Sequence, residues 1–153
     1  MPWRGGIAVP ELGISARDDR YNESEEVVDI VIKMQNLMTV YDSLVMCKYA
    51  FTAGLTVTDI INLLKYTTGK EYTVDKLMEI GDRVWKIERW IDNQLGITSK
   101  DDKLPKRMLT PHANRSDTKV PYIVEKWLPI YYRKRGFNGG WRCQGTRCVI
   151  LIY

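Results

Sequence analysis

The strongest constraint on the fold is a helical repeat of apolar residues between positions 73 and 95. Aliphatic side chains recur there at spacings of three and four, at Leu77, Ile80, Val84, Ile87 and Ile91. Such a stripe covers one face of an α-helix. Thr73 before the stripe and Gly96 after it are typical of a helix start and a helix stop. The sequence therefore predicts an amphipathic helix over this segment.

Further helices are expected on both sides of this segment. The first is long, because it follows a capping pair of Asn22 and Glu25 and runs to Gly54. Its apolar positions are Val27, Val31, Met34, Met38, Tyr41, Val45 and Tyr49. A short helix is expected over 58–69 and a last one over 121–135. No strand alternation or internal repeat accompanies these signals, so we predict an all-α fold, an irregular helical domain of about four helices.

The length of 153 residues suits one domain. Residues 1–21 carry glycine and proline too densely for a helix and are expected to form an irregular lead-in. Residues 22–137 are expected to form the helical domain. Residues 138–153 form an atypical tail, because a pair of glycines at 139–140 precedes an uncharged, β-prone run at 149–153.

Composition narrows the functional classes. No apolar stretch reaches the roughly 18 to 20 residues of a membrane span, and no secretory signal is visible, so we expect no membrane partner and a cytoplasmic location. The net charge of +4 is spread along the chain, and nucleic-acid binding is not expected. The basic run Arg133-Lys134-Arg135 is expected to complement a helix dipole or to lie in water. Three cysteines are too few for a disulfide scaffold.

Several chemical groups lack the partners that a site needs. His112 has no partnered nucleophile, and Cys143 and Cys148 lack the further ligands of a zinc site. We interpret Glu88-Arg89 and Asp101-Asp102 as charged pairs on a solvated surface. No hydrolytic chemistry is therefore predicted, and the two tail cysteines are expected to be incidental, with a redox or metal role as the alternative.

The stretch VYDSLVMCKYA at 40–50 is different, because it sets Asp42 and Cys47 in an apolar run. An ionised carboxylate is costly to bury unless a donor hydrogen-bonds to it. On an unbroken helix the two residues lie roughly 140° apart around the axis, so they face different neighbours. The alternative is a surface or capping aspartate and a small buried cysteine.

Four stretches together resemble the C-terminal domain of the tungsten-dependent aldehyde ferredoxin oxidoreductases. They are YDSLVMCKY at 41–49, TGKEYTVDKLMEIGDRVWKIERW at 68–90, KDDKLPKR at 100–107 and YYRKRGF at 131–137. Enzymes of this family oxidise aldehydes to carboxylic acids and pass the electrons to ferredoxin. The resemblance implies that Asp42, Leu44 and Met46 contact a pterin cofactor of tungsten or molybdenum. It implies that Cys47 supplies one of four thiolates to a [4Fe-4S] cluster.

The chain also departs from the family pattern. The family usually has Gly-Leu before the cysteine, where this chain has Val45-Met46, and no function is assigned to residues 91–95. The other cluster cysteines and the N-terminal cofactor domain have no match. We therefore expect the isolated chain to be inactive and free of cofactors, with the missing N-terminal part of the enzyme and ferredoxin as partners. Homo-oligomerisation stays open. The alternative is a helical protein-interaction module without redox activity.

Overall fold

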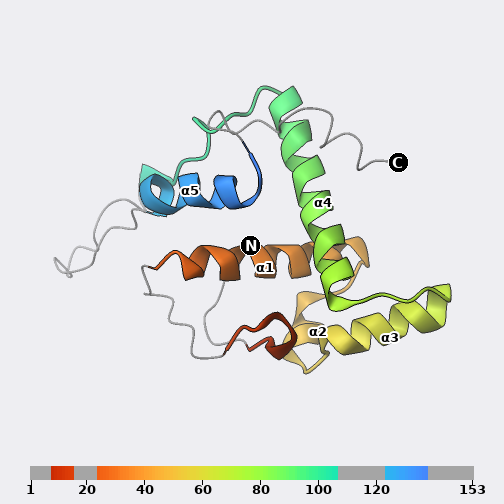
Figure 1. Ribbon diagram of the computed structural model, residues 1–153. Helices are drawn as coiled ribbons and strands as arrows, with labels where there is room; N and C mark the ends of the chain where they lie inside the picture. Colours follow the sequence, from red (N-terminus) through yellow and green to blue (C-terminus); the bar gives the residue numbers. More distant parts are fainter. Residues whose placement is uncertain (1–7, 16–23, 107–122, 138–153) are drawn as a thin grey trace. The chain divides into compact units, whose positions relative to one another are not determined.

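The computed structural model describes residues 8–15, 24–106 and 123–137, and these contain five α-helices and one short 3-10 helix (Figure 1). The elements are η1 (Pro10–Leu12), α1 (Glu26–Ser43), α2 (Lys48–Thr52), α3 (Val57–Thr68), α4 (Val74–Gln94) and α5 (Ile123–Lys134). The one β-pairing within the described ranges is an isolated antiparallel bridge between Val9 and Ile14. The prediction of an all-α fold is confirmed.

The chain divides into two compact units, residues 1–86 and residues 87–153, and α4 crosses the boundary between them. Of the residues and segments named from the sequence, several lie outside the described ranges: Asn22, His112, Cys143, Cys148, the expected start of the last helix at 121, and the tail at 138–153. No helix in the described part of the chain is both long and apolar enough to cross a lipid bilayer.

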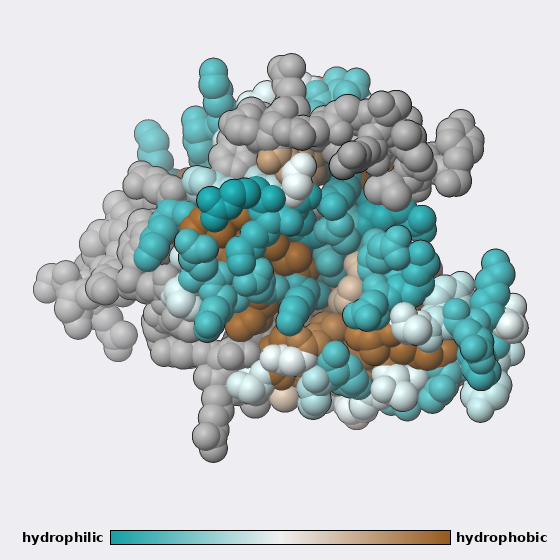
Figure 2. All heavy atoms as spheres, viewed as in Figure 1, coloured by the Kyte–Doolittle hydropathy of each residue, from teal (hydrophilic) through white to brown (hydrophobic). Residues whose placement is uncertain are grey.

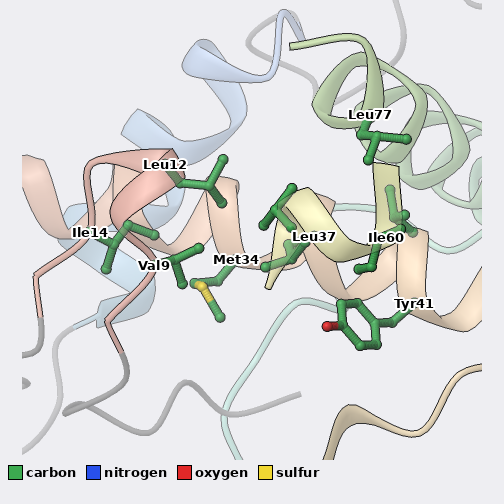
Figure 3. Packing of buried hydrophobic residues seen from close by; sticks show 10 residues of the cluster. Val9, Leu12, Ile14, Met34, Leu37, Tyr41, Ile60 and Leu77 are labelled. Atoms are coloured by element: carbon green, nitrogen blue, oxygen red, sulfur yellow. The ribbon is translucent and has the colours of Figure 1, made fainter. Parts of the chain in front are cut away.

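The core of the first unit joins η1 to the helices α1, α3 and α4 (Figure 3). Its buried members are Val9, Leu12, Ile14, Met34, Leu37, Val40, Tyr41, Val57, Ile60 and Leu77. Three of them come from residues 8–15, within the segment expected to be an irregular lead-in. Lys33 on α1 donates to the carbonyl oxygen of Leu12 over 2.8 Å, which holds the η1 turn against the helix. Breaker residues in this segment thus shape a turn that delivers apolar side chains to the core.

The prediction of one unbroken helix to Gly54 is wrong, because α1 ends at Ser43 and α2 begins at Lys48. Residues 44–47 form a turn in which Val45 has a left-handed backbone, with φ of 55°. A right-handed helix cannot continue through that conformation. Two residues of the predicted apolar face, Val45 and Tyr49, are not buried, because their side chains are 93% and 65% exposed.

The ends of α3 and α4 follow the local signals in the sequence. Thr56 and Asp59 form a reciprocal capping box at the start of α3, two residues before the predicted start, and Gly69 ends the helix in a left-handed conformation. The hydroxyl of Thr73 accepts from the Lys76 N–H over 3.2 Å and caps α4 as expected. Short-range hydrogen bonds therefore fix these boundaries.

Candidate functional site

The residues predicted to bind cofactors lie on a turn between two helices. Asp42 is in the last turn of α1, and Cys47 is the extended residue directly before α2, with φ of −71° and ψ of 130°. The expected angle of roughly 140° between them assumed one unbroken helix, so it does not describe this structure. The carboxylate and the thiol are presented from the ends of two different helices.

Two backbone hydrogen bonds close this turn. The Met46 N–H donates to the carbonyl of Tyr41 over 2.9 Å, and the Val45 N–H donates to that of Asp42 over 3.0 Å. This pair of bonds is the Schellman motif, which ends a helix with one left-handed residue. The Tyr41 hydroxyl also donates to the carbonyl of Leu55 over 3.4 Å. The turn that separates Asp42 from Cys47 is therefore held by the backbone and by the core beneath it.

The polar groups of this turn face outward. Asp42 and Cys47 are exposed, and neither side chain has a hydrogen-bond partner among the described residues. The alternative expectation of a buried cysteine is therefore wrong, whereas its expectation of a surface aspartate agrees with the structure. Leu44 and Met46 are half-buried and pack against the core. The turn is anchored by apolar side chains and displays one carboxylate and one thiol.

The Asp42 carboxylate and the Cys47 thiol have the chemistry of part of a cofactor site. The Asp42 carboxylate offers two oxygens that accept hydrogen bonds, as the N–H groups of a pterin require, and Cys47 offers one sulfur ligand. The described residues hold no group of three or more His, Cys, Asp or Glu side chains that could bind a metal ion. A cluster with four thiolate ligands would therefore need donors from outside this part of the chain.

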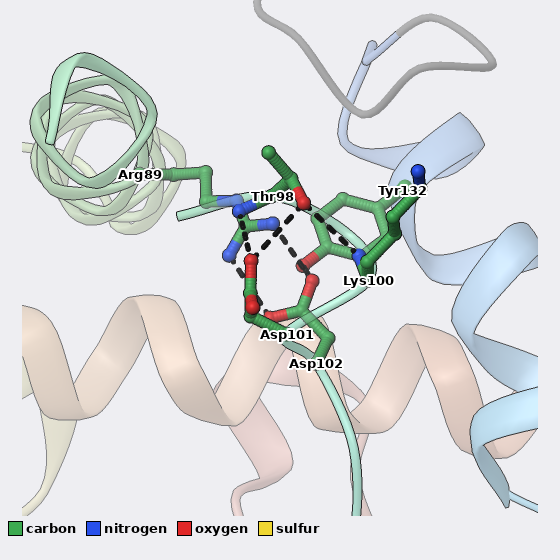
Figure 4. Close-up of polar contacts among 6 residues, drawn as sticks. All are labelled: Arg89, Thr98, Lys100, Asp101, Asp102 and Tyr132. Atoms are coloured by element: carbon green, nitrogen blue, oxygen red, sulfur yellow. Dashed lines mark hydrogen bonds and ion pairs between the residues drawn. The ribbon is translucent and has the colours of Figure 1, made fainter. Parts of the chain in front are cut away.

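A second polar cluster lies in the unit formed by residues 87–153 (Figure 4). Arg89 of α4 donates through Nη1 and Nη2 to the two carboxylate oxygens of Asp102, over 3.0 and 2.7 Å. The hydroxyl of Tyr132 on α5 donates to the same carboxylate over 2.7 Å. The guanidinium carbon of Arg89 lies 5.2 Å from the centre of the Tyr132 ring. One carboxylate thus joins two helices and the loop between them.

Burial and charge set the protonation of this cluster. Burial and the hydrogen bond to Asp102 strongly raise the pKa of Tyr132. Burial alone would lower the pKa of Arg89, but the hydrogen bond to Asp102 and nearby negative charge raise it. The phenol and the guanidinium therefore both keep their protons at neutral pH. The groups serve as fixed donors to Asp102, which is a structural role.

The neighbouring Asp101 has a different task. Its carboxylate accepts from the N–H of Thr98 over 2.7 Å and from the Thr98 hydroxyl over 3.0 Å. The backbone hydrogen bond is the main reason that the pKa of Asp101 is lowered. Asp101 therefore closes a local turn, whereas the adjacent Asp102 binds Arg89.

Two interpretations of charged residues are wrong in part. Arg89 is 6% exposed and Arg135 is 2% exposed, so neither lies on a solvated surface. Glu88 and Asp101 are exposed as expected, and Arg133 and Lys134 are exposed in the last turn of α5. The guanidinium carbon of Arg135 lies 5.3 Å from the centre of the Tyr131 ring. Sequence reasoning missed this cluster because its residues are far apart along the chain. The one signal that could have found it is their presence in three of the stretches that carry the family resemblance.

Comparisons with known proteins agree with the resemblance. The sequence model of the family described as "Aldehyde ferredoxin oxidoreductase, domains 2 & 3" matches residues 3–143. The chain is 32% identical to a tungsten-containing aldehyde ferredoxin oxidoreductase of Pyrococcus horikoshii and 31% identical to that of Pyrococcus furiosus. An enzyme of the same description from Thermococcus kodakarensis is 30% identical. Each match covers 88% of this chain and 24% of the relative's length.

Proposed function

Because the chain belongs to the aldehyde ferredoxin oxidoreductase family, we propose that it contributes a pterin contact and one cluster ligand to a tungstopterin iron-sulfur enzyme. The observation that carries this proposal is the turn at 42–47. It displays a carboxylate and a thiol from two helix ends, neither of them with a partner among the described residues, within a sequence that resembles the cofactor box of the family.

Each residue of the turn has a separate task in this proposal. Asp42 accepts hydrogen bonds from the N–H groups of the pterin and so orients it. Cys47, as a thiolate, binds one iron of a [4Fe-4S] cluster. Leu44 and Met46 hold the turn against the core, so that its backbone lies beside the pterin. The cofactors, when bound, would supply the redox chemistry, and these residues would bind and orient them.

The reaction proposed for the complete enzyme is oxidation of an aldehyde to a carboxylic acid, with two electrons passed to ferredoxin. The chain spans 24% of the length of the relatives that it matches, so this activity needs the other parts of the enzyme. One thiolate does not hold a cluster that takes four ligands. We therefore propose that the chain alone binds neither cofactor and is inactive.

Metal content tests the proposal. The chain purified alone is expected to contain neither tungsten nor iron and to lack the visible absorption of an iron-sulfur cluster. Stoichiometric tungsten together with that absorption would refute this part of the proposal.

The complete enzyme containing this chain tests the two residues separately. Cys47→Ser is expected to lower the iron content per polypeptide, and Asp42→Asn the tungsten content. Glu88→Gln, which removes an exposed carboxylate elsewhere, is the matched control and should change neither. Unchanged iron in Cys47→Ser would remove the cysteine from the proposed cluster.

A second candidate function is a helical protein-interaction module without redox activity. Exposed apolar side chains favour it, since Val45, Tyr66 and Leu95 are 93%, 83% and 74% exposed. Figure 2 shows apolar surface over α3 on the face in view. Exposed apolar surface suits contact with another polypeptide, whether the chain is part of an enzyme or an interaction module. Aldehyde oxidation that returns when the chain is combined with the remaining part of the enzyme would favour the enzymatic function.

A further inference from the structure

The turn at 42–47, here called the cofactor turn, is followed by a helix too short to hold its own position. The helix α2 has five residues, from Lys48 to Thr52, and no side chain caps its start. An isolated helix of this length is not stable in water, so packing against other elements must fix it. Cys47 directly precedes α2. The place of the Cys47 thiol relative to Asp42 on α1 therefore depends on how α2 is attached to α1.

Tyr41 of α1 contacts both α2 and the loop after it. Its ring lies edge-on against the ring of Phe51 in α2, with centroids 6.3 Å apart and planes at 82°. Its hydroxyl donates to the carbonyl of Leu55, in the loop that follows α2, over 3.4 Å. Its own carbonyl accepts the Met46 N–H over 2.9 Å and the Leu44 N–H over 3.2 Å. Tyr41 is therefore hydrogen-bonded to the cofactor turn and packed against α2.

Burial makes Tyr41 a fixed support for these contacts. Tyr41 is 1% exposed and is among the largest fully buried side chains in the described part of the chain. It belongs to the apolar core of the first unit (Figure 3), and Phe51 and Leu55 are half-buried against the same core. The next residue, Asp42, is exposed. The chain thus passes within one peptide unit from a side chain fixed in the core to a carboxylate displayed on the surface.

We infer that the ring of Tyr41 is a positioning group that fixes Cys47 and Asp42 relative to each other for their cofactors. This inference rests on the proposed function, and it assigns Tyr41 no contact with a cofactor. The ring acts through Phe51, which holds α2 and therefore Cys47. Residues that bind cofactors must be held to within about 0.5 Å, which a surface turn achieves only with support from beneath. The hydroxyl contributes less than the ring, because 3.4 Å is long for a hydrogen bond between oxygens.

The first test measures amide hydrogen exchange in the isolated chain by NMR. Tyr41→Leu removes the ring contact from one side, and Phe51→Leu removes it from the other. Each is expected to raise the exchange rate of the Met46 amide at least about fivefold relative to that of the Ile97 amide, which makes the equivalent hydrogen bond after α4. Leu77→Ala, a change at a buried residue of α4 in the same core, is the control and should leave this ratio unchanged.

Two results of this exchange measurement overturn the inference. One is an unchanged ratio in both Tyr41→Leu and Phe51→Leu, because the turn would then hold without the ring contact. The other is an equal rise in Leu77→Ala, because Tyr41 would then only add to the stability of the core. If Tyr41→Leu does not fold, Phe51→Leu decides between these outcomes, since Phe51 is only half-buried and its replacement costs the core less.

The second test measures the reduction potential of the [4Fe-4S] cluster in the complete enzyme, which depends on the surroundings of the sulfur ligands and not on protein stability. Tyr41→Leu and Phe51→Leu are expected to shift this potential, whereas Tyr41→Phe, which keeps the ring, and Leu77→Ala are expected to keep the wild-type value. A wild-type potential in Tyr41→Leu, or a shifted one in Tyr41→Phe, overturns the inference.

The iron content of Cys47→Ser separates failure of this inference from failure of the proposed function. If Cys47→Ser lowers the iron content while Tyr41→Leu leaves the exchange ratio and the potential unchanged, the proposed function stands and only this inference fails. Unchanged iron in Cys47→Ser refutes the proposed function, whatever the exchange rates are.

Discussion

Tyr132 donates its hydroxyl hydrogen to the carboxylate of Asp102, thirty positions earlier in the chain, over 2.7 Å. The same carboxylate receives two hydrogen bonds from Arg89, so three donors meet one acceptor group (Figure 4). The Tyr132 ring also packs edge-on against Phe137, with centroids 5.7 Å apart. The second unit is therefore organised around a polar centre, whereas the first is organised around an apolar one.

Asp102→Asn is expected to destabilise the protein by about 2–3 kcal/mol, because the Arg89 charge would remain buried without its counter-charge. The partial exposure of the Asp102 side chain, 23%, places the effect below that of a fully buried pair. Denaturant unfolding followed by circular dichroism measures the change. Glu88→Gln, an exposed neighbour of Arg89, is the control and should stay within about 0.5 kcal/mol of wild type. A similar effect of both changes would contradict a specific role for Asp102.

Tyr132 is expected to make the protein less stable in alkali. Burial and the hydrogen bond to Asp102 raise its pKa above the ordinary value of 10.0. Above that pH the unfolded chain releases the phenol proton while the folded chain keeps it, so the unfolded state binds fewer protons and stability falls as pH rises. Well below pH 10 both states keep the proton, so the contribution of Tyr132 to stability is fully present and does not change with pH.

The variant Tyr132→Phe isolates this effect. Wild type should lose about 1.4 kcal/mol more per pH unit than the variant above the ordinary tyrosine pKa. Burial also raises the pKa of Tyr41, so the difference between the two proteins, and not the slope of either, is the measured quantity. Parallel curves for wild type and Tyr132→Phe would show that the phenol ionises alike in both states.

Gly81→Ala is expected to destabilise the first unit by about 1–3 kcal/mol, although alanine is the better helix former. A Cβ atom at position 81 would overlap the backbone carbonyl of Asn36, which cannot move aside as a flexible side chain can. Thermal unfolding measures the loss. Asn62→Ala on the exposed face of α3 is the control, and it should be neutral or slightly stabilising. A stabilised Gly81→Ala protein would contradict the close contact between α1 and α4.

The sequence predicts those helix ends that local chemistry determines. Thr73 and Gly69 are recognisable because a hydroxyl cap and a left-handed glycine act within one turn of the chain. The end of α1 is missed because Val45 occupies the position where glycine normally gives the signal. Its conformation follows from the packing of Leu44 and Met46 on a core that includes distant residues. A periodic pattern alone does not contain that information.

The sequence pattern also fails to predict the burial of Arg89, because that burial depends on tertiary packing. On α4, Arg89 lies roughly opposite the stripe that includes Leu77 and Ile87, so helical periodicity assigns it to solvent. It is buried because α5 and the loop with Asp102 cover that side of the helix. At the same end, Ile91 from the stripe is 46% exposed. The covered face of α4 thus changes along its length, which only the tertiary structure determines.

The sequence predicts which residues form the candidate site, but it does not predict which secondary-structure elements carry them. Asp42 and Cys47 were expected from one continuous helix, and they come from the ends of two. Their roles rest on the family resemblance, because spacing alone also fits a surface aspartate and an unrelated cysteine. The roles of Asp42, Leu44, Met46 and Cys47 toward cofactors stay predictions.

The reactivity of Cys47 toward a thiol reagent distinguishes a free thiol, expected in the isolated chain, from an iron-bound sulfur, expected in the complete enzyme. The thiol is exposed in the folded chain. In a variant with Cys143→Ser and Cys148→Ser, it should therefore react within about threefold of its rate in denaturant. In the complete, metal-loaded enzyme the same thiol should be protected, because a sulfur bound to iron is not free to attack the reagent. Removal of the metals with a chelator should restore the reaction. Rapid labelling of Cys47 in the loaded enzyme, with iron content unchanged, would contradict a role as a cluster ligand.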